Sequence, residues 1–209
     1  MSGSVSINPY STNQPQNTFL AQTQGLVQGC AYDDPSARME LAGGVLASTE
    51  TLVMWGGVPL TELVNVTGSG AEGIGPSLKR STTQANTTGW SVYNQAGSMI
   101  ITPGTTAPVS GTGSYVAFFR YGSNIRIAVQ VDPALVAALV ASNVAINAEA
   151  LYWDVTNFRV TLTTTGGNFA LPTTTRLLSV NTNSQVVSTG AAGVAPYTWT
   201  AGDCGIILI

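Results

Sequence analysis

Carboxylates are the only conventional acid–base groups in this sequence of 209 residues, which contains ten Asp and Glu residues and no histidine. Without histidine there is no Ser-His-Asp triad, no Cys-His dyad and no histidine-containing zinc site. Asp33 and Asp34 form a close pair, but Pro35 follows them, and the three residues together predict a turn. Glu149 and Asp154 would lie on opposite faces of one strand. We therefore expect no catalytic residue and no metal site, and a glycosidase pair drawn from distant carboxylates stays open as an alternative.

Residues 68–73 match the Gly-x-Gly-x-x-Gly pattern of dinucleotide-binding loops. Such a loop must open a helix whose N-terminus faces the pyrophosphate, and Gly75-Pro76 would break that helix. Lys79 follows Leu78 rather than a glycine, so it completes no phosphate-binding loop either. The sequence therefore predicts no nucleotide and no other cofactor.

The two cysteines, Cys30 and Cys204, are too few for a cysteine-rich metal site or a disulfide-dense scaffold. They leave two alternatives, a single bridge between distant parts of the chain or two buried thiols. Folding in the cytoplasm favours the thiols.

Four tryptophans could form a sugar-binding platform, but aromatic side chains in β-rich proteins more often anchor a core or an interface. We expect the second role for them: Trp55, Trp90, Trp153 and Trp199.

Charge is scarce, since only 8% of the residues are charged and the formal net charge is −3. Ser, Thr, Asn and Gln supply roughly a third of the chain and carry most of its polarity, an excess over ordinary soluble composition. The single lysine and six arginines are scattered, so they form no stripe that could follow a phosphate backbone. No apolar run reaches about 18 residues, and the first residues lack the pattern of a signal peptide. We expect no nucleic acid, no membrane, and synthesis in the cytoplasm.

Four parts follow one another along the chain. Residues 1–29 are polar, uncharged and poor in apolar residues, and they predict an extended N-terminal arm, with a frayed terminus as the alternative. Residues 30–131 predict a β-rich domain or first half, residues 132–143 a short helix, and residues 144–209 a β-rich C-terminal part. Whether these are one domain or two stays open.

Several segments carry the β prediction. Gly122-Ser123-Asn124 predicts a hairpin between two apolar strands, and Thr156-Asn157 predicts another. The apolar residues 205–209 predict a buried last strand, whereas residues 68–89 are too polar for a core element and predict a long loop. The fold class is therefore mainly β, a sandwich or barrel of short antiparallel strands with one short helix and the arm.

The helix prediction rests on Asp132 as the N-cap and Pro133 at the first helical position, before an apolar run that ends near Asn143. A helix that is apolar nearly all round must pack against something. A buried strand is the alternative for the same run.

The two ends of the chain share a recognisable pattern. Residues 149–155 carry Tyr and Asp on a strand, a Thr-rich strand then runs to Gly166, and Leu171-Pro172 precedes a closing apolar strand. Towards the start, a polar arm leads into Gly29-Cys30-Ala31-Tyr32-Asp33-Asp34-Pro35. This pattern resembles the capsid cement, or decoration, proteins of tailed bacteriophages, over residues 20–60 and 145–209.

The resemblance implies a non-enzymatic structural protein on the exterior of the virion. Such a protein binds the major capsid protein and bridges neighbouring subunits to stabilise the shell, acting as a homo-oligomer, a trimer or a dimer. Uncharged polar side chains suit that role, since they form interface hydrogen bonds without the desolvation cost of ions. The expected interface residues lie in the arm: Tyr10, Phe19, Leu20 and Leu26.

Two other functions stay open. A tail fibre or baseplate β-module that binds host glycans would need exposed aromatic side chains, for which Trp90 and Tyr93 are the candidates. A carbohydrate-active enzyme would need two of the carboxylates.

Overall fold

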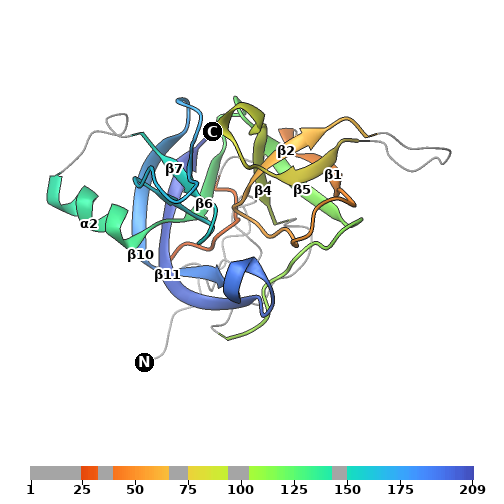
Figure 1. The fold of residues 1–209 in the computed structure, drawn as a ribbon. Helices are drawn as coiled ribbons and strands as arrows, with labels where there is room; N and C mark the ends of the chain where they lie inside the picture. The colour runs from red at the N-terminus through yellow and green to blue at the C-terminus, as the bar shows by residue number, and fades with distance from the viewer. Residues whose placement is uncertain (1–24, 33–39, 66–74, 94–103, 143–149) are drawn as a thin grey trace, which may run out of the picture.

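The computed structural model describes residues 25–32, 40–65, 75–93, 104–142 and 150–209, and everything below concerns these residues. The fold is mainly β with one short α-helix, as predicted (Figure 1). Of the expected interface residues, Tyr10, Phe19 and Leu20 lie outside the described residues, as does most of the predicted arm.

Five strands from the first half of the chain close into a barrel in the order β1-β3-β2-β4-β5. In this barrel β1 and β3 run parallel, and the other neighbouring strands are antiparallel. Apolar side chains such as Leu60, Leu78 and Phe118 fill its core. The strands are β1 Ala42–Leu46, β2 Pro59–Leu63, β3 Ser77–Arg80, β4 Gly89–Val92 and β5 Tyr115–Arg120.

Residues 68–89, which the sequence predicted to form a long loop, contribute a strand to this barrel. The loop prediction was therefore wrong for residues 77–80. That strand is β3, and its Leu78 is fully buried. A short 3-10 helix, η2 (Gln84–Asn86), follows before β4. Leu78 is the only apolar residue of β3, so the alternation that identifies a strand is too short to recognise.

A second sheet has the order β10-β11-β6 and curves beside the barrel (Figure 1). β11 pairs with both neighbours in antiparallel fashion, and it contains the buried last strand that the sequence predicts. Its strands are β6 Arg126–Gln130, β10 Arg176–Ser188 and β11 Thr198–Leu208, and a 3-10 helix, η3 (Ala191–Gly193), joins the last two.

The predicted hairpin at residues 122–124 was wrong. A tight turn is present, with φ of 87° at Gly122 and 54° at Asn124. However, β5 pairs with β1 and β4 of the barrel, while β6 pairs with β11. The chain therefore passes from one sheet to the other at this turn. The pairing of β6 depends on a strand distant in sequence, so the turn residues alone do not determine it.

Residues 25–32 line both edges of the second sheet. The backbone N–H of Gln28 donates to the Gln185 carbonyl of β10 at 2.9 Å. A few residues later, the N–H of Tyr32 donates to the Arg126 carbonyl of β6 at 2.8 Å. Val27 is fully buried between these contacts. The last residues of the predicted arm, from Gly25 onward, are thus packed into the fold.

A third, small sheet has the order β8-β7-β9 and contains the predicted hairpin at Thr156-Asn157, where Asp154 pairs with Arg159. The N–H of Asp132 donates to the Val160 carbonyl at 2.8 Å, which ties this sheet to the short segment between β6 and α2. Its strands are β7 Tyr152–Asp154, β8 Arg159–Thr161 and β9 Phe169–Ala170.

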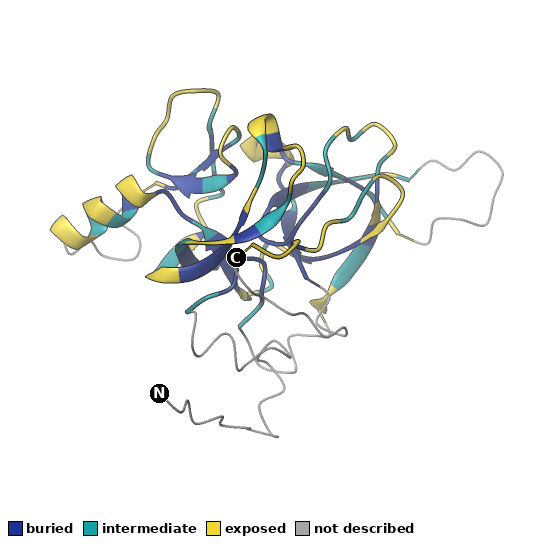
Figure 2. Ribbon diagram, turned by 90° about the horizontal axis from the view of Figure 1, so that it is seen from below, coloured by how far each residue is buried: buried dark blue, intermediate teal, exposed yellow. Residues whose placement is uncertain are grey.

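The predicted helix is present as α2, Pro133–Ser142. Asp132 caps it as expected, since its Oδ1 accepts the Ala134 N–H at 3.0 Å. The expectation that this apolar helix packs against something is met on one side, where Val136 and Leu139 are partly buried against the core. Leu135 is buried at its base, but α2 projects from the body and Val140 is 81% exposed (Figures 1 and 2).

Candidate functional site

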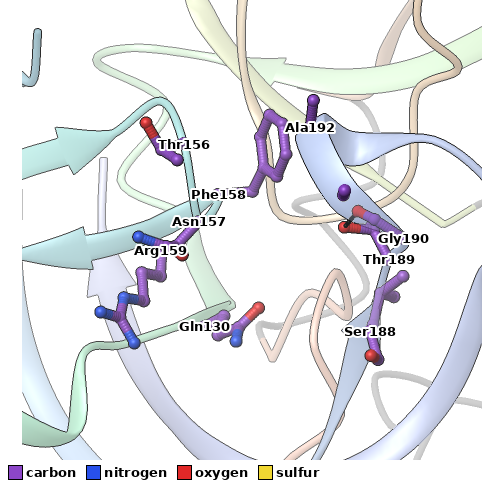
Figure 3. Close-up of a pocket in the computed structure, with 11 residues that line it drawn as sticks. Gln130, Thr156, Asn157, Phe158, Arg159, Ser188, Thr189, Gly190 and Ala192 are labelled. Atoms are coloured by element: carbon purple, nitrogen blue, oxygen red, sulfur yellow. Dashed lines mark hydrogen bonds between the residues drawn. The ribbon is translucent and has the colours of Figure 1, made fainter.

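A polar pocket of about 350 Å³ lies where three segments meet (Figure 3). Gln130 contributes from the end of β6, residues 156–159 from the β7–β8 turn, and residues 187–192 from the end of β10 and the start of η3. Gln130 directs its amide into the space between the turn and Ser188 (Figure 3). The lining offers hydroxyl and amide groups together with the ring of Phe158.

Asp154 builds the turn that forms one wall. Its Oδ1 accepts the backbone N–H groups of Thr156 and Asn157, both at 3.0 Å, and its Oδ2 accepts the Asn157 side-chain amide at 2.7 Å. Burial alone would raise the pKa of Asp154, but these hydrogen bonds and the nearby Arg159 outweigh it and lower the pKa. The carboxylate is therefore a structural group, with both oxygens occupied.

Phe158 fixes the turn against the rest of the protein. Its ring meets Trp55 edge-on, with the ring centroids 5.3 Å apart. The Arg80 guanidinium lies 4.3 Å from the Trp55 centroid and 4.8 Å from the Phe158 centroid. Gly193 of η3 approaches the same ring so closely that a Cβ there would lie 2.5 Å from it. The Phe158 side chain therefore joins the two walls of the pocket, the β7–β8 turn and η3.

Arg159 is held between two carboxylates. Its Nη2 lies 3.3 Å from Asp132 Oδ2, and its Nε lies 3.5 Å from Asp154 Oδ2. Asp132 Oδ2 also accepts the Thr161 hydroxyl at 3.0 Å. Two negative charges thus face one positive charge, so this side of the pocket carries no net attraction for an anion.

Leu26 is the one described member of the expected interface residues. It is half-buried, its N–H donates to Ser184 Oγ at 3.2 Å, and its carbonyl accepts the Gln185 N–H at 2.8 Å. Its backbone is bound within its own chain, so the structure places Leu26 at the edge of β10 and away from the pocket.

The aromatic candidates for glycan binding were wrong. Trp90 is 0% exposed and Tyr93 is 9% exposed, so neither offers a surface for stacking a sugar. All four tryptophans are core side chains, as predicted. Trp90 packs edge-on against Trp153, with centroids 5.4 Å apart.

The two cysteines are buried thiols, one of the two alternatives that the sequence left open. Burial raises the pKa of Cys30 to about 12, and it raises the pKa of Cys204 as well. Neither thiol is therefore ionised near neutral pH, which makes both poor nucleophiles.

Sequence reasoning missed the pocket residues Gln130, Ser188 and Ala192. They are distant in sequence and belong to no motif. Asp154-Val155-Thr156-Asn157 is the one local signal, because an Asp followed by Thr and Asn favours a side-chain-capped turn. That signal gives the turn and not the cavity beside it.

Within the described ranges, no three His, Cys, Asp or Glu side chains come together as metal ligands, and no helix there is long and apolar enough to cross a bilayer. No protein-family model, no curated protein and no solved structure matches this chain.

Proposed function

We propose that this chain is a non-enzymatic structural protein of a virus particle, which binds the outside of the capsid and bridges capsid subunits. Its partner is then the major capsid protein, and its copies act as a symmetric oligomer. The proposal rests on the resemblance of both ends of the chain to cement proteins, and on one structural observation, the exposed helix α2.

α2 supports an assembly role because it combines an apolar sequence with an exposed position. Its ten residues, PALVAALVAS, include no charged side chain. Val136 and Leu139 are only half-buried, and Val140 is largely exposed. Such a helix is usually buried, so a partner surface would gain by covering it.

The base of α2 is firmly attached, which suits a docking element. Asp132 caps the helix with one carboxylate oxygen and binds Thr161 and Arg159 with the other. Leu135 anchors the first turn in the core. The orientation of the helix is therefore set before a partner arrives, which lowers the entropic cost of binding.

The test of the proposal is the number of copies of this chain in purified particles, measured by quantitative mass spectrometry against the major shell protein. We expect a number equal to that of the shell subunit or a simple fraction of it. A few copies would move the protein to a fibre or a vertex, and complete absence would overturn the virion assignment.

We predict that Val140→Lys weakens binding to capsids at least tenfold and leaves the thermal midpoint unchanged. A lysine places a charge within the apolar contact, while a largely exposed side chain contributes little to folding. Binding is measured by co-sedimentation with undecorated capsids. Val64→Lys is the matched control, because Val64 is 88% exposed and lies after β2 of the barrel. Equal loss in both variants, or in neither, would contradict a role for α2.

Deletion of residues 1–24 is predicted to leave the fold intact and to reduce capsid binding at least tenfold. The buried contacts of Val27 and Gln28 remain in the truncated chain, so its unfolding midpoint should not fall. An arm adds affinity through effective concentration once the rest of the chain has docked. A truncated chain that binds capsids as tightly as the full chain would show that the arm plays no part in attachment.

A glycan-binding tail module remains the second candidate. The aromatic pair that the sequence suggested is buried, so this function needs another site. The pocket between the β7–β8 turn and η3 is the observation that keeps it open.

A further inference from the structure

The geometry points to a binding site for one uncharged sugar unit in the pocket lined by Gln130, the β7–β8 turn and residues 187–192. This inference does not depend on where the protein sits in a particle, since a capsid protein and a tail protein can both carry such a site. It rests on the size, the polarity, the charge and the backbone conformation of the pocket.

The size suits a small ligand. A volume of about 350 Å³ lies near the lower end of the range for ligand pockets, roughly 300 to 1,000 Å³. The pocket is partly open to solvent. One sugar ring of a longer chain could enter while the rest of the chain stays in solvent.

The polarity of the lining favours a ligand rich in hydroxyl groups. Gln130 presents an amide, while Thr156 and Ser188 present hydroxyls, and these groups both donate and accept hydrogen bonds. An apolar ligand would remove them from water without replacing those bonds. Sugar hydroxyls also donate and accept, so they match this lining.

The charge around the pocket favours an uncharged ligand. The one cation in the lining, Arg159, is already paired with Asp132 and Asp154. A phosphate, sulfate or uronic acid would meet two carboxylates close to that arginine. The Asp154 oxygens are committed to the turn by the N–H groups of Thr156 and Asn157 and by the Asn157 amide, so they are not open to a metal ion.

The backbone of the pocket is unusual at two places. Phe158 and Ala192 both have φ of 55°, in the left-handed region that residues with a side chain rarely adopt. The Phe158 side chain, from the β7–β8 turn, points toward Ala192 of η3 (Figure 3). Such conformations persist where the surrounding structure enforces them, and they gather at binding sites. Here they fix the course of the β7–β8 turn and of η3 on the two sides of the pocket.

The experiment measures binding of a panel of uncharged monosaccharides and disaccharides to the full chain by saturation-transfer NMR, followed by titration of the best ligand. The panel contains glucose, galactose, mannose, N-acetylglucosamine and their common disaccharides, with glucuronic acid and inorganic phosphate as charged probes. We expect at least one neutral sugar to bind and both charged probes to bind more weakly.

Two variants locate the site, and one controls for folding. Gln130→Ala removes the amide, and Ser188→Trp fills the pocket from an exposed position. Both are expected to weaken sugar binding at least tenfold. Thr182→Trp adds the same bulk at another exposed position of β10, outside the pocket, and should bind sugar like the unmodified chain.

Three results would overturn the inference: no binding of any neutral sugar, tighter binding of glucuronic acid or phosphate, or sugar binding that survives both Gln130→Ala and Ser188→Trp. None of these depends on capsids. A failure here is therefore distinguishable from a failure of the copy-number test.

Discussion

Replacing Gly29 by alanine is expected to destabilise the protein by about 4 kcal/mol. Gly29 has φ of 80°, and a Cβ there would lie 2.5 Å from the Gly56 Cα and 2.7 Å from the Tyr93 ring. The backbone of residues 25–32 meets the turn that precedes β2 of the barrel at this point. Because one contact is with backbone, a change of rotamer cannot relieve it. The free energy of unfolding in urea is the measurement.

Gly113→Ala is the matched control for that substitution. Its φ of 77° is almost the same, but nothing lies within 4 Å of the added Cβ. It should cost only about 1 to 2 kcal/mol, the cost of a left-handed conformation for alanine. Equal losses in the two variants would show that the close approach of Gly29 to Gly56 does not limit stability.

The second large effect is expected at Arg80, where alanine should cost about 3 kcal/mol. The guanidinium lies between Trp55 and Phe158 and donates through Nη2 to the Val53 carbonyl. Removing the side chain leaves a void between two buried rings, in the place that joins the barrel to the β7–β8 turn.

Arg80→Met separates packing from charge. Burial lowers the pKa of Arg80 to about 10, and its Nε and Nη1 are buried without a hydrogen-bond partner among the described residues. Keeping the charge there is therefore costly, while the long stem fills space. Methionine keeps the stem without the charge, so it should lose less than half of what alanine loses. Losses of equal size in urea denaturation would mean that the charge carries the effect.

The sequence was sufficient for those elements whose signals are local. Asp132 and Pro133 mark the start of α2, and Thr156-Asn157 marks the hairpin between β7 and β8. The apolar residues of the last strand could only be stable if buried, and Ile207 is 0% exposed. These predictions depend on capping, turn geometry and burial, which act over a few residues.

Other features depend on contacts between distant segments and could not be predicted. Leu78 alone gives no strand pattern, although β3 completes the barrel between β1 and β2. Residues 122–124 predict a hairpin because Gly, Ser and Asn are also the residues that form tight turns between paired strands. Which sheet receives β6 is decided by β11, more than 70 residues further along the chain.

The candidate pocket belongs to this second group. Its walls come from β6, the β7–β8 turn and η3, and they are brought together by Phe158 and Arg80. The aromatic residues that suggested sugar binding in the sequence, Trp90 and Tyr93, are core residues instead. Exposure of an aromatic side chain is a property of the packed molecule, so sequence alone could not assign it.

The path of residues 25–32 along both edges of the second sheet sets an order of folding. Their partners, Gln185 and Arg126, are distant in sequence, whereas the barrel closes with strands drawn from residues 42–120 alone. Non-local contacts carry a large loop-closure entropy and form slowly. On a ribosome the barrel can therefore assemble while β10 and β11 are still being made. Residues 25–32, although synthesised early, gain their partners on β10 only after β10 itself has been made.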